Sequence, residues 1–187
     1  MTVIAQTDRL ILRRWRSSDG AGFVRLNCDP RVMEFFPVLL TPDESNQLAD
    51  RIESHFQQRG FGLCAVELRA TSEFIGYIGL SVPSFEAKFT PCVEIGWRLS
   101  ADHWGKGLAT EGARAIVRYA FETHTLREIV SFTVPANTRS VRVMEKIHMT
   151  RDFASDFDHP LLPKGHTLRR HVLYRLTSEQ YFSRKNL

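Results

Sequence analysis

Short apolar or β-rich runs recur along the chain and are separated by polar or turn-forming stretches, a pattern typical of β-strands. These runs cover residues 10–15, 61–68, 74–81, 92–99, 128–134 and 170–176. The three in the middle of the chain follow one another closely, and the stretch 69–73 joins the first two. We therefore expect these three to be consecutive antiparallel strands.

Helical signals lie between the strand-like runs. In Thr41-Pro42-Asp43-Glu44, a capping threonine, a proline at the first helical position and a glutamate at the third form a capping box. This box predicts a helix that runs to about Arg59 and ends at Gly60. Apolar residues recur near helical spacing over residues 107–123, and shorter helical segments are predicted at 18–26, 31–36 and 139–147. The order of strands and helices predicts a mixed α/β domain.

Length and composition narrow the class of protein. The 187 residues suit one domain, 1–187, and 43% hydrophobic with 25% charged residues is ordinary for a soluble globular protein. The amino terminus does not resemble a signal peptide, and no run approaches the roughly 18 apolar residues of a membrane span. Three scattered cysteines fit a reducing, cytoplasmic setting and are expected to be buried.

The net charge of +4 is mildly basic and would favour polyanions. A nucleic-acid binder gathers its Lys and Arg residues in a patch or stripe. Here the clusters Arg13-Arg14-Trp15-Arg16 and Leu168-Arg169-Arg170-His171 lie in predicted strands, where alternate residues face opposite sides. We therefore interpret the clusters as solvated faces and expect no nucleic-acid partner.

The strongest chemical signal is Trp104-Gly105-Lys106-Gly107-Leu108-Ala109, which lies where a predicted strand ends and a helix begins. Two glycines let the backbone approach a ligand closely, and the unpaired N–H groups and dipole of a helix start attract phosphate. A glycine pair at a helix start is also often only a turn. The run is not a nucleotide P-loop, because Lys106 is followed by Gly107 rather than by Ser or Thr. It also lacks the third glycine of a dinucleotide fingerprint.

A second segment, residues 135–140, opens the later helix and contains Asn137 and Ser140. An Asn and a Ser three residues apart at a helix start are also explained by capping alone. Together, however, the two segments resemble the GNAT superfamily of acetyltransferases, and more narrowly its RimJ/RimL-like branch. The resemblance runs from Arg9 through Tyr174 and is most specific at residues 94–97, 104–111 and 137–146.

This resemblance implies a mixed, mostly antiparallel sheet of about seven strands flanked by helices. It also implies an N-acyltransferase that uses acetyl-CoA as cosubstrate, with no metal. The backbone of Lys106 to Thr110 would hold the coenzyme A pyrophosphate, the pantetheine arm would lie against the strand 95–99, and Asn137 would orient the cofactor. The implied cofactor-binding residues are Ile95, Trp97, Lys106, Gly107, Leu108, Ala109, Thr110 and Asn137.

Acyl transfer to an amine needs a neutral nucleophile, stabilisation of the oxyanion and a proton for the departing thiolate. The resemblance places Glu94 beside the acetyl group, where its carboxylate would act as a general base and accept the proton of the amine by way of water. Ser140 would hydrogen-bond or protonate the thiolate, and a backbone N–H near Trp97 or Arg98 would meet the thioester oxygen. The alternatives are an ion-paired or solvent-facing strand glutamate at position 94 and a first-turn serine that satisfies the backbone at position 140.

The chain departs from the family pattern after the second helix, where His148 takes the place of a glycine. We interpret this as a variant helix end. If His148 must adopt a positive φ there, the conformation is tolerable but costs more than it would for glycine. Residues 154–168 are expected to be a long loop over the acceptor site, in which one of its histidines could contact the acceptor. His159, His166 and His171 match no zinc pattern.

The acceptor is the part that the sequence does not identify, because one scaffold serves many amines. A primary amine of a protein N-terminus or of a small molecule is expected, and the chain could form a homodimer. The alternative function is a catalytically silent module that binds CoA or senses acyl-CoA.

Overall fold

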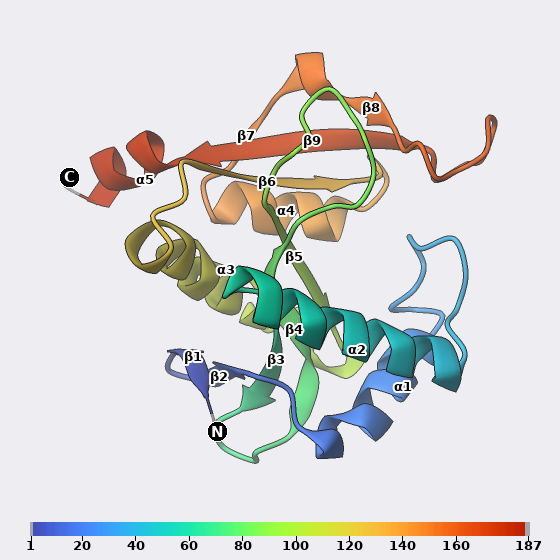
Figure 1. Cartoon of the computed structure of the whole chain (residues 1–187), viewed down its shortest axis with the longest axis vertical. Helices are drawn as coiled ribbons and strands as arrows, with labels where there is room; N and C mark the ends of the chain where they lie inside the picture. Colours follow the sequence, from blue (N-terminus) through green and yellow to red (C-terminus); the bar gives the residue numbers. More distant parts are fainter. Residues whose placement is uncertain (1, 186–187) are drawn as a thin grey trace. The chain divides into compact units, whose positions relative to one another are not determined.

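The computed structural model describes residues 2–185, which divide into two compact units. Unit 1 comprises residues 2–81 and 96–116, and unit 2 comprises residues 82–95 and 117–185. Figure 1 labels the helices and strands of both units. The interpretation of the chain as one domain stays a prediction.

The sheet of unit 1 has the strand order β1-β2-β3-β4-β5. These strands are β1 (Val3–Gln6), β2 (Leu10–Arg13), β3 (Leu63–Leu68), β4 (Phe74–Ser81) and β5 (Glu94–Leu99). Strands β1 to β4 pair antiparallel, as the apolar pattern predicts for β3 and β4. The first two residues of β5, Glu94 and Ile95, belong to unit 2.

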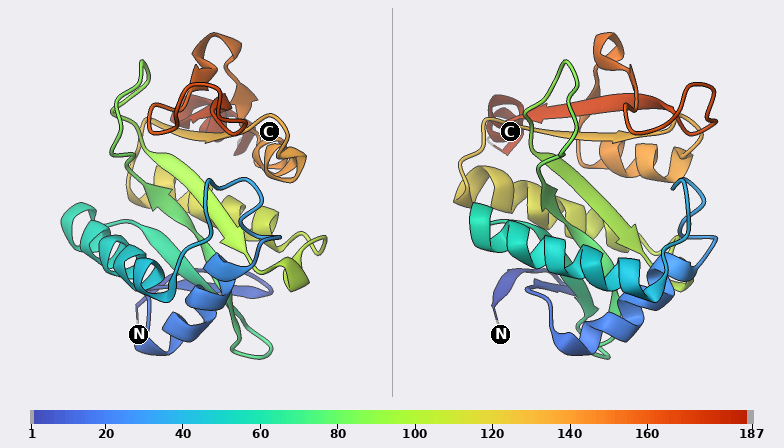
Figure 2. Two further views of the ribbon diagram at one scale, coloured as in Figure 1. Left: turned by 90° about the vertical axis from the view of Figure 1, so that its right-hand side faces the viewer. Right: turned by 45° about the vertical axis from the view of Figure 1, so that its right-hand side comes forward.

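Helices cover both faces of the unit 1 sheet. Tyr77 of β4 contacts Phe23 of α1 (Gly20–Cys28), which lies beside α2 (Pro42–Arg59) in Figures 1 and 2. The next residue of β4, Ile78, faces Gly112 of α3 (Leu108–Arg118), where an added Cβ would lie 2.5 Å from the Ile78 side chain. Because successive strand residues point to opposite faces, α1 and α3 pack on opposite sides of β4.

The α2 helix confirms the capping prediction. The Thr41 hydroxyl accepts a hydrogen bond from the Glu44 backbone N–H, and the Glu44 carboxylate accepts one from the Thr41 backbone N–H at 2.8 Å. At the other end, Gly60 adopts the left-handed conformation with φ of 76° and its N–H donates to the Phe56 carbonyl. Local residue types therefore determine both ends of this helix.

Unit 2 is built around β9 (Arg170–Thr177), which pairs antiparallel with β6 (Glu128–Thr133), β7 (Thr150–Arg151) and β8 (Phe157–Asp158). The start of β5 pairs parallel with β6 through Glu94 and Val130. Helix α4 (Thr138–Lys146) lies along β6, and α5 (Ser178–Lys185) follows β9 (Figure 1). Met144 of α4, Ile129 of β6 and Leu173 of β9 are fully buried in the core.

The fold class is confirmed as a mixed α/β arrangement with a mostly antiparallel sheet flanked by helices. Residues 2–185 contain nine strands rather than about seven. The additions include β1 and the two-residue strands β7 and β8, which are too short to give an apolar pattern. Long-range pairing with β9, rather than local propensity, creates the last two.

Three local predictions are wrong. The predicted helix at residues 31–36 is a series of turns, held by hydrogen bonds from the Val32 and Met33 N–H groups to the Asp29 carbonyl. Arg13 is 1% exposed and forms ion pairs with Asp19 and Glu67. The basic run Arg13-Arg14-Trp15-Arg16 is therefore not simply a solvated face. Cys28 is exposed, Cys64 is buried and Cys92 lies between these extremes.

None of the helices formed by residues 2–185 is long and apolar enough to span a membrane.

Candidate active site

The glycine loop of unit 1 has the backbone geometry expected of a close-approach site. After β5, a short helical turn (Ala101–His103) leads to Gly105 and Gly107, with φ angles of 74° and 78°. Side chains other than glycine rarely adopt these angles, so both positions favour glycine. The Gly107 carbonyl accepts a hydrogen bond from the Glu111 N–H at 3.0 Å, and α3 starts at Leu108. The first N–H groups of α3 therefore have no partner within the helix.

Most residues of this loop lie at the surface rather than in the core. Gly105, Lys106 and Gly107 are exposed, Ala109 and Thr110 are half-buried, and Leu108 is buried. The indole Nε1 of Trp104 donates to the Leu99 carbonyl at 2.8 Å, which fixes the entrance of the loop to the end of β5. The Lys106 Nζ donates to the Asp102 carbonyl at 3.0 Å. The Lys106 charge is thereby held near the helix start.

Arg9, which precedes β2, contacts this loop, and the sequence did not indicate that contact. Its Nη1 donates to the Lys106 carbonyl at 2.9 Å, and its Nε donates to the Glu111 carboxylate at 2.6 Å. The Thr7 hydroxyl donates to the same carboxylate, also at 2.6 Å. Although burial raises it, these hydrogen bonds bring the pKa of Glu111 below its usual value. Glu111 therefore anchors the loop to the amino-terminal segment.

Two further predicted cofactor residues lie in β5. Ile95 is fully buried in unit 2, and Trp97 is half-buried in unit 1. Because their positions differ by two, both side chains face the same side of the strand. This is the side opposite to that of Arg98.

Glu94, the predicted base, is a half-buried residue of unit 2 whose backbone pairs with Val130 of β6. The negative charge of Glu94 interacts electrostatically with the nearby thiol of Cys92. Burial, together with the negative charge of Glu94, raises the pKa of Cys92 to about 11. Cys92 is therefore a neutral thiol at physiological pH and not a nucleophile.

Asn137 and Ser140 are brought together at the start of α4. The Asn137 Oδ1 accepts the Ser140 backbone N–H at 3.1 Å, and its Nδ2 donates to the Thr133 hydroxyl at 3.0 Å. The capping interpretation of Asn137 is thus correct for these contacts. The half-buried Ser140 hydroxyl makes no hydrogen bond within residues 2–185, so it is available to a ligand.

The other end of α4 confirms the expectation for His148, whose φ is 68°. The His148 N–H donates to the Glu145 carbonyl, and the Met149 N–H donates to the Met144 carbonyl at 3.0 Å. These are the two bonds of a Schellman motif, with histidine in the position that glycine usually takes.

Two of the three late histidines belong to an aromatic cluster of unit 2. The ring centroids of His159 and His171 are 5.2 Å apart, and His159 lies 4.7 Å from Phe85. Burial lowers the pKa of both histidines, so both are neutral near pH 7. His166 instead accepts the Leu168 N–H at 3.1 Å and shapes the loop. Contact of any of them with an acceptor stays a prediction.

Within residues 2–185, no group of three or more His, Cys, Asp or Glu side chains is arranged to hold a metal ion.

Comparison with known proteins agrees with these features. Residues 9–150 match the model of the acetyltransferase (GNAT) domain. An FsC-acetyl coenzyme A-N(2)-transacetylase from Aspergillus fumigatus is 34% identical over 167 residues, which cover 84% of this chain and 69% of that protein.

Solved structures share the fold. A GNAT-family acetyltransferase from Bacillus anthracis aligns with a TM-score of 0.76 at 26% identity, covering 96% of this chain and 99% of that one. RimJ from Mycobacterium smegmatis, solved in complex with CoA-disulfide, has the same fold with a TM-score of 0.74 at 18% identity, covering 91% and 83%. The matched domain includes the glycine loop, Glu94, Asn137 and Ser140. The chain therefore belongs to the GNAT family, and its activity is acetyl-CoA-dependent N-acetylation.

Proposed function

We propose that the chain transfers acetyl from acetyl-CoA to the primary amine of a protein N-terminus or of a small molecule. The observation that carries this proposal is the glycine loop, in which two left-handed glycines precede the free N–H groups of α3. The backbone from Lys106 to Thr110 holds the pyrophosphate of coenzyme A in this proposal. Ile95 and Trp97 line the pantetheine arm. Asn137 orients the cofactor through the hydrogen-bonding positions of its side-chain amide that the contacts with Thr133 and Ser140 do not use.

Glu94 and Ser140 carry the chemistry in this proposal. The amine nitrogen attacks the thioester carbon, and the proton that the amine loses passes through water to Glu94. A backbone N–H near Trp97 or Arg98 stabilises the oxyanion. When the carbon–sulfur bond breaks, the thiolate receives a hydrogen bond or a proton from Ser140, whose hydroxyl is unengaged by the described protein atoms. A serine that gives up its proton regains one from water, and Glu94 releases to water the proton that it accepted.

The demand on Glu94 depends on the acceptor. An α-amine has a pKa of about 7.7 to 8.0 and a lysine about 10.4, which makes a lysine about 3 to 4 kcal/mol more costly to deprotonate at a given pH. A carboxylate that acts through water is therefore best suited to an α-amine.

We place the reaction in the cytoplasm and propose a homodimer as the working assembly.

The test is a screen of primary amines with acetyl-CoA, in which release of the CoA thiol is measured. The panel contains amino acids, polyamines and ribosomal-protein N-terminal peptides. We expect amine-dependent thiol release for at least one class, together with an acetylated product detected by mass spectrometry. Binding of coenzyme A without thiol release for any amine would instead favour the silent CoA-binding module.

A further inference from the structure

Two arginines of unit 1 are almost fully buried, and they differ in how their charge is compensated. Arg13 is 1% exposed and forms ion pairs with the buried carboxylates of Asp19 and Glu67. Arg98 of β5 is 7% exposed, and no carboxylate among residues 2–185 forms an ion pair with it. An isolated buried charge is costly, and proteins usually pair it.

The contacts of Arg98 are all uncharged. Its Nη1 donates to the Asn27 Oδ1 at 2.5 Å, while its guanidinium carbon lies 3.9 Å from the ring centroid of Phe36 and 5.3 Å from that of Tyr77. The Nε atom is buried and has no hydrogen-bond partner among the described residues. In a guanidinium, Nε and Nη2 project their N–H groups from one edge, the edge that receives the two oxygens of a carboxylate. That edge of Arg98 is not satisfied by the protein.

The surroundings of Arg98 separate it from the pyrophosphate loop. Asn27 lies in α1 and Tyr77 contacts Phe23 of α1, so the guanidinium lies on the face of β4 that α1 covers. Helix α3, whose start is the proposed pyrophosphate site, packs on the opposite face through Gly112 and Ile78. An anion at Arg98 is therefore a different group from the phosphates of coenzyme A.

The backbone of Arg98 also has a part in the proposed reaction. Trp97 and Arg98 are the strand residues to which the proposed function assigns the oxyanion contact. In that proposal, a group bound by the Arg98 side chain is held by the same residue whose backbone faces the reacting thioester. Phe36, which covers the guanidinium, is 39% exposed and sits in the turn segment 29–41, so the covered face is close to solvent.

We infer that Arg98 is an acceptor-binding residue that pairs with a carboxylate of a small amine substrate. This inference rests on the proposed function and narrows it, because the acceptor becomes a compact amino acid-like molecule with its amine close to a carboxylate. The carboxylate completes the open guanidinium edge and compensates the buried charge. A protein N-terminus has no α-carboxylate beside its amine, because that carboxyl group forms a peptide bond.

The test compares each proteinogenic amino acid that has a primary amine with its α-carboxamide, which keeps the side chain and a primary α-amine but lacks the negative charge. Thiol release from acetyl-CoA is measured for the wild-type chain, for Arg98→Met and for the control Arg25→Gln, which changes an exposed arginine of α1. Charge-assisted hydrogen bonds of about 1.5 to 3 kcal/mol correspond to a factor of about 10 to 150. We expect the best amino acid to exceed its amide by that factor in kcat/KM.

Arg98→Met is expected to lose this preference by slowing the acid and leaving the amide within about threefold. Its melting temperature is expected to stay close to that of the wild type, because the substitution removes an unpaired buried charge. Arg25→Gln is expected to keep the preference. Equal rates for acid and amide in the wild type, or an equal loss of both in Arg98→Met, would overturn the inference.

A binding measurement keeps the inference separate from the proposed function. In the presence of saturating coenzyme A, which has no acetyl group to transfer, an amino acid should raise the melting temperature of the wild type while its amide does not. Arg98→Met should bind coenzyme A normally but lose the amino acid response. Failure of thiol release with this response intact would contradict the proposed function alone. Weaker binding of coenzyme A itself by Arg98→Met would assign Arg98 to the cofactor and refute the inference.

Discussion

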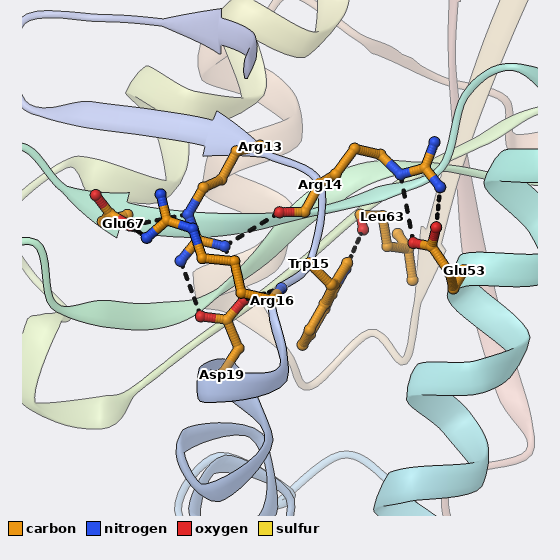
Figure 3. A network of polar contacts seen from close by, with 8 residues as sticks. All are labelled: Arg13, Arg14, Trp15, Arg16, Asp19, Glu53, Leu63 and Glu67. Carbon is orange, nitrogen blue, oxygen red and sulfur yellow. Dashed lines mark hydrogen bonds and ion pairs between the residues drawn. The ribbon is translucent and has the colours of Figure 1, made fainter. Parts of the chain in front are cut away.

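Replacement of Arg13 by methionine is expected to lower the free energy of unfolding by about 3–5 kcal/mol, the usual cost of breaking a buried ion pair from one side. Arg13 donates to both Asp19 carboxylate oxygens, at 2.7 and 2.8 Å, and to Glu67 at 2.8 Å (Figure 3). The hydrogen bonds to Asp19 raise the pKa of the Arg13 guanidinium above its usual value, against the effect of burial. Without Arg13, two carboxylates that are 2% and 4% exposed lose this partner.

Urea denaturation of the purified variant measures this loss. The control is Arg31→Met, which removes an arginine whose side chain is 60% exposed and whose ion pair with Asp29 lies at the surface. Surface pairs contribute about 0–1 kcal/mol, so the control should be close to the wild type. A loss below about 1 kcal/mol for Arg13→Met would show that the cluster does not stabilise unit 1 as its geometry indicates.

Glu94→Gln and Ser140→Ala are each expected to lower kcat for the best acceptor by about 10²–10⁴, the range for general acid or base catalysis. Neither substitution removes a group assigned to the pyrophosphate, so the dissociation constant of coenzyme A should stay within about threefold of the wild-type value. A change of that size is smaller than the effect of losing one hydrogen bond to a charged group. The loss in Glu94→Gln should be smaller for α-amines than for lysine side chains, because an α-amine is partly neutral at pH 8.

Steady-state thiol release gives the rates, and Glu86→Gln with Ser84→Ala supplies matched controls at exposed positions of unit 2. Both controls should leave kcat unchanged. If Glu94→Gln and Ser140→Ala remain within about twofold of the wild type, the two assigned roles are wrong even though the family is established.

Features encoded by neighbouring residues were predictable from the sequence. The capping box at Thr41 and the stop at Gly60 each depend on a few adjacent residues, and both are confirmed. The same holds for the glycine loop, whose positive φ angles follow from Gly105 and Gly107 themselves. His148 is instructive, because only the resemblance to the family indicated that a histidine would occupy a left-handed position.

Features that depend on distant partners were not predictable. Arg13 and Glu67 are far apart in the sequence, so the arginine cluster gave no sign of a buried ion pair. Arg9 reaches the glycine loop across nearly one hundred positions, and nothing in its local sequence indicated that contact. Residues 31–36 have a plausible cap at Asp29, yet tertiary context leaves them as turns. The unpaired charge of Arg98 likewise emerges only when its neighbours from α1 and β4 are known.

Calorimetric titration of coenzyme A into Gly107→Ala tests most directly whether the glycine loop binds coenzyme A. An added Cβ at Gly107 would meet only the Arg9 Nη2, at 3.7 Å, so the fold tolerates it, although the positive φ adds some strain. Gly165→Ala is the matched control, because Gly165 has a φ of 84° and open space around it but lies outside the loop.

A Cβ that holds the pyrophosphate away from one backbone N–H costs about 1.5 to 3 kcal/mol, or about 10- to 150-fold in affinity. We expect the wild type and Gly165→Ala to bind coenzyme A equally and Gly107→Ala to bind it more weakly by that factor. Equal affinity for all three proteins would contradict the assignment of the pyrophosphate to this loop.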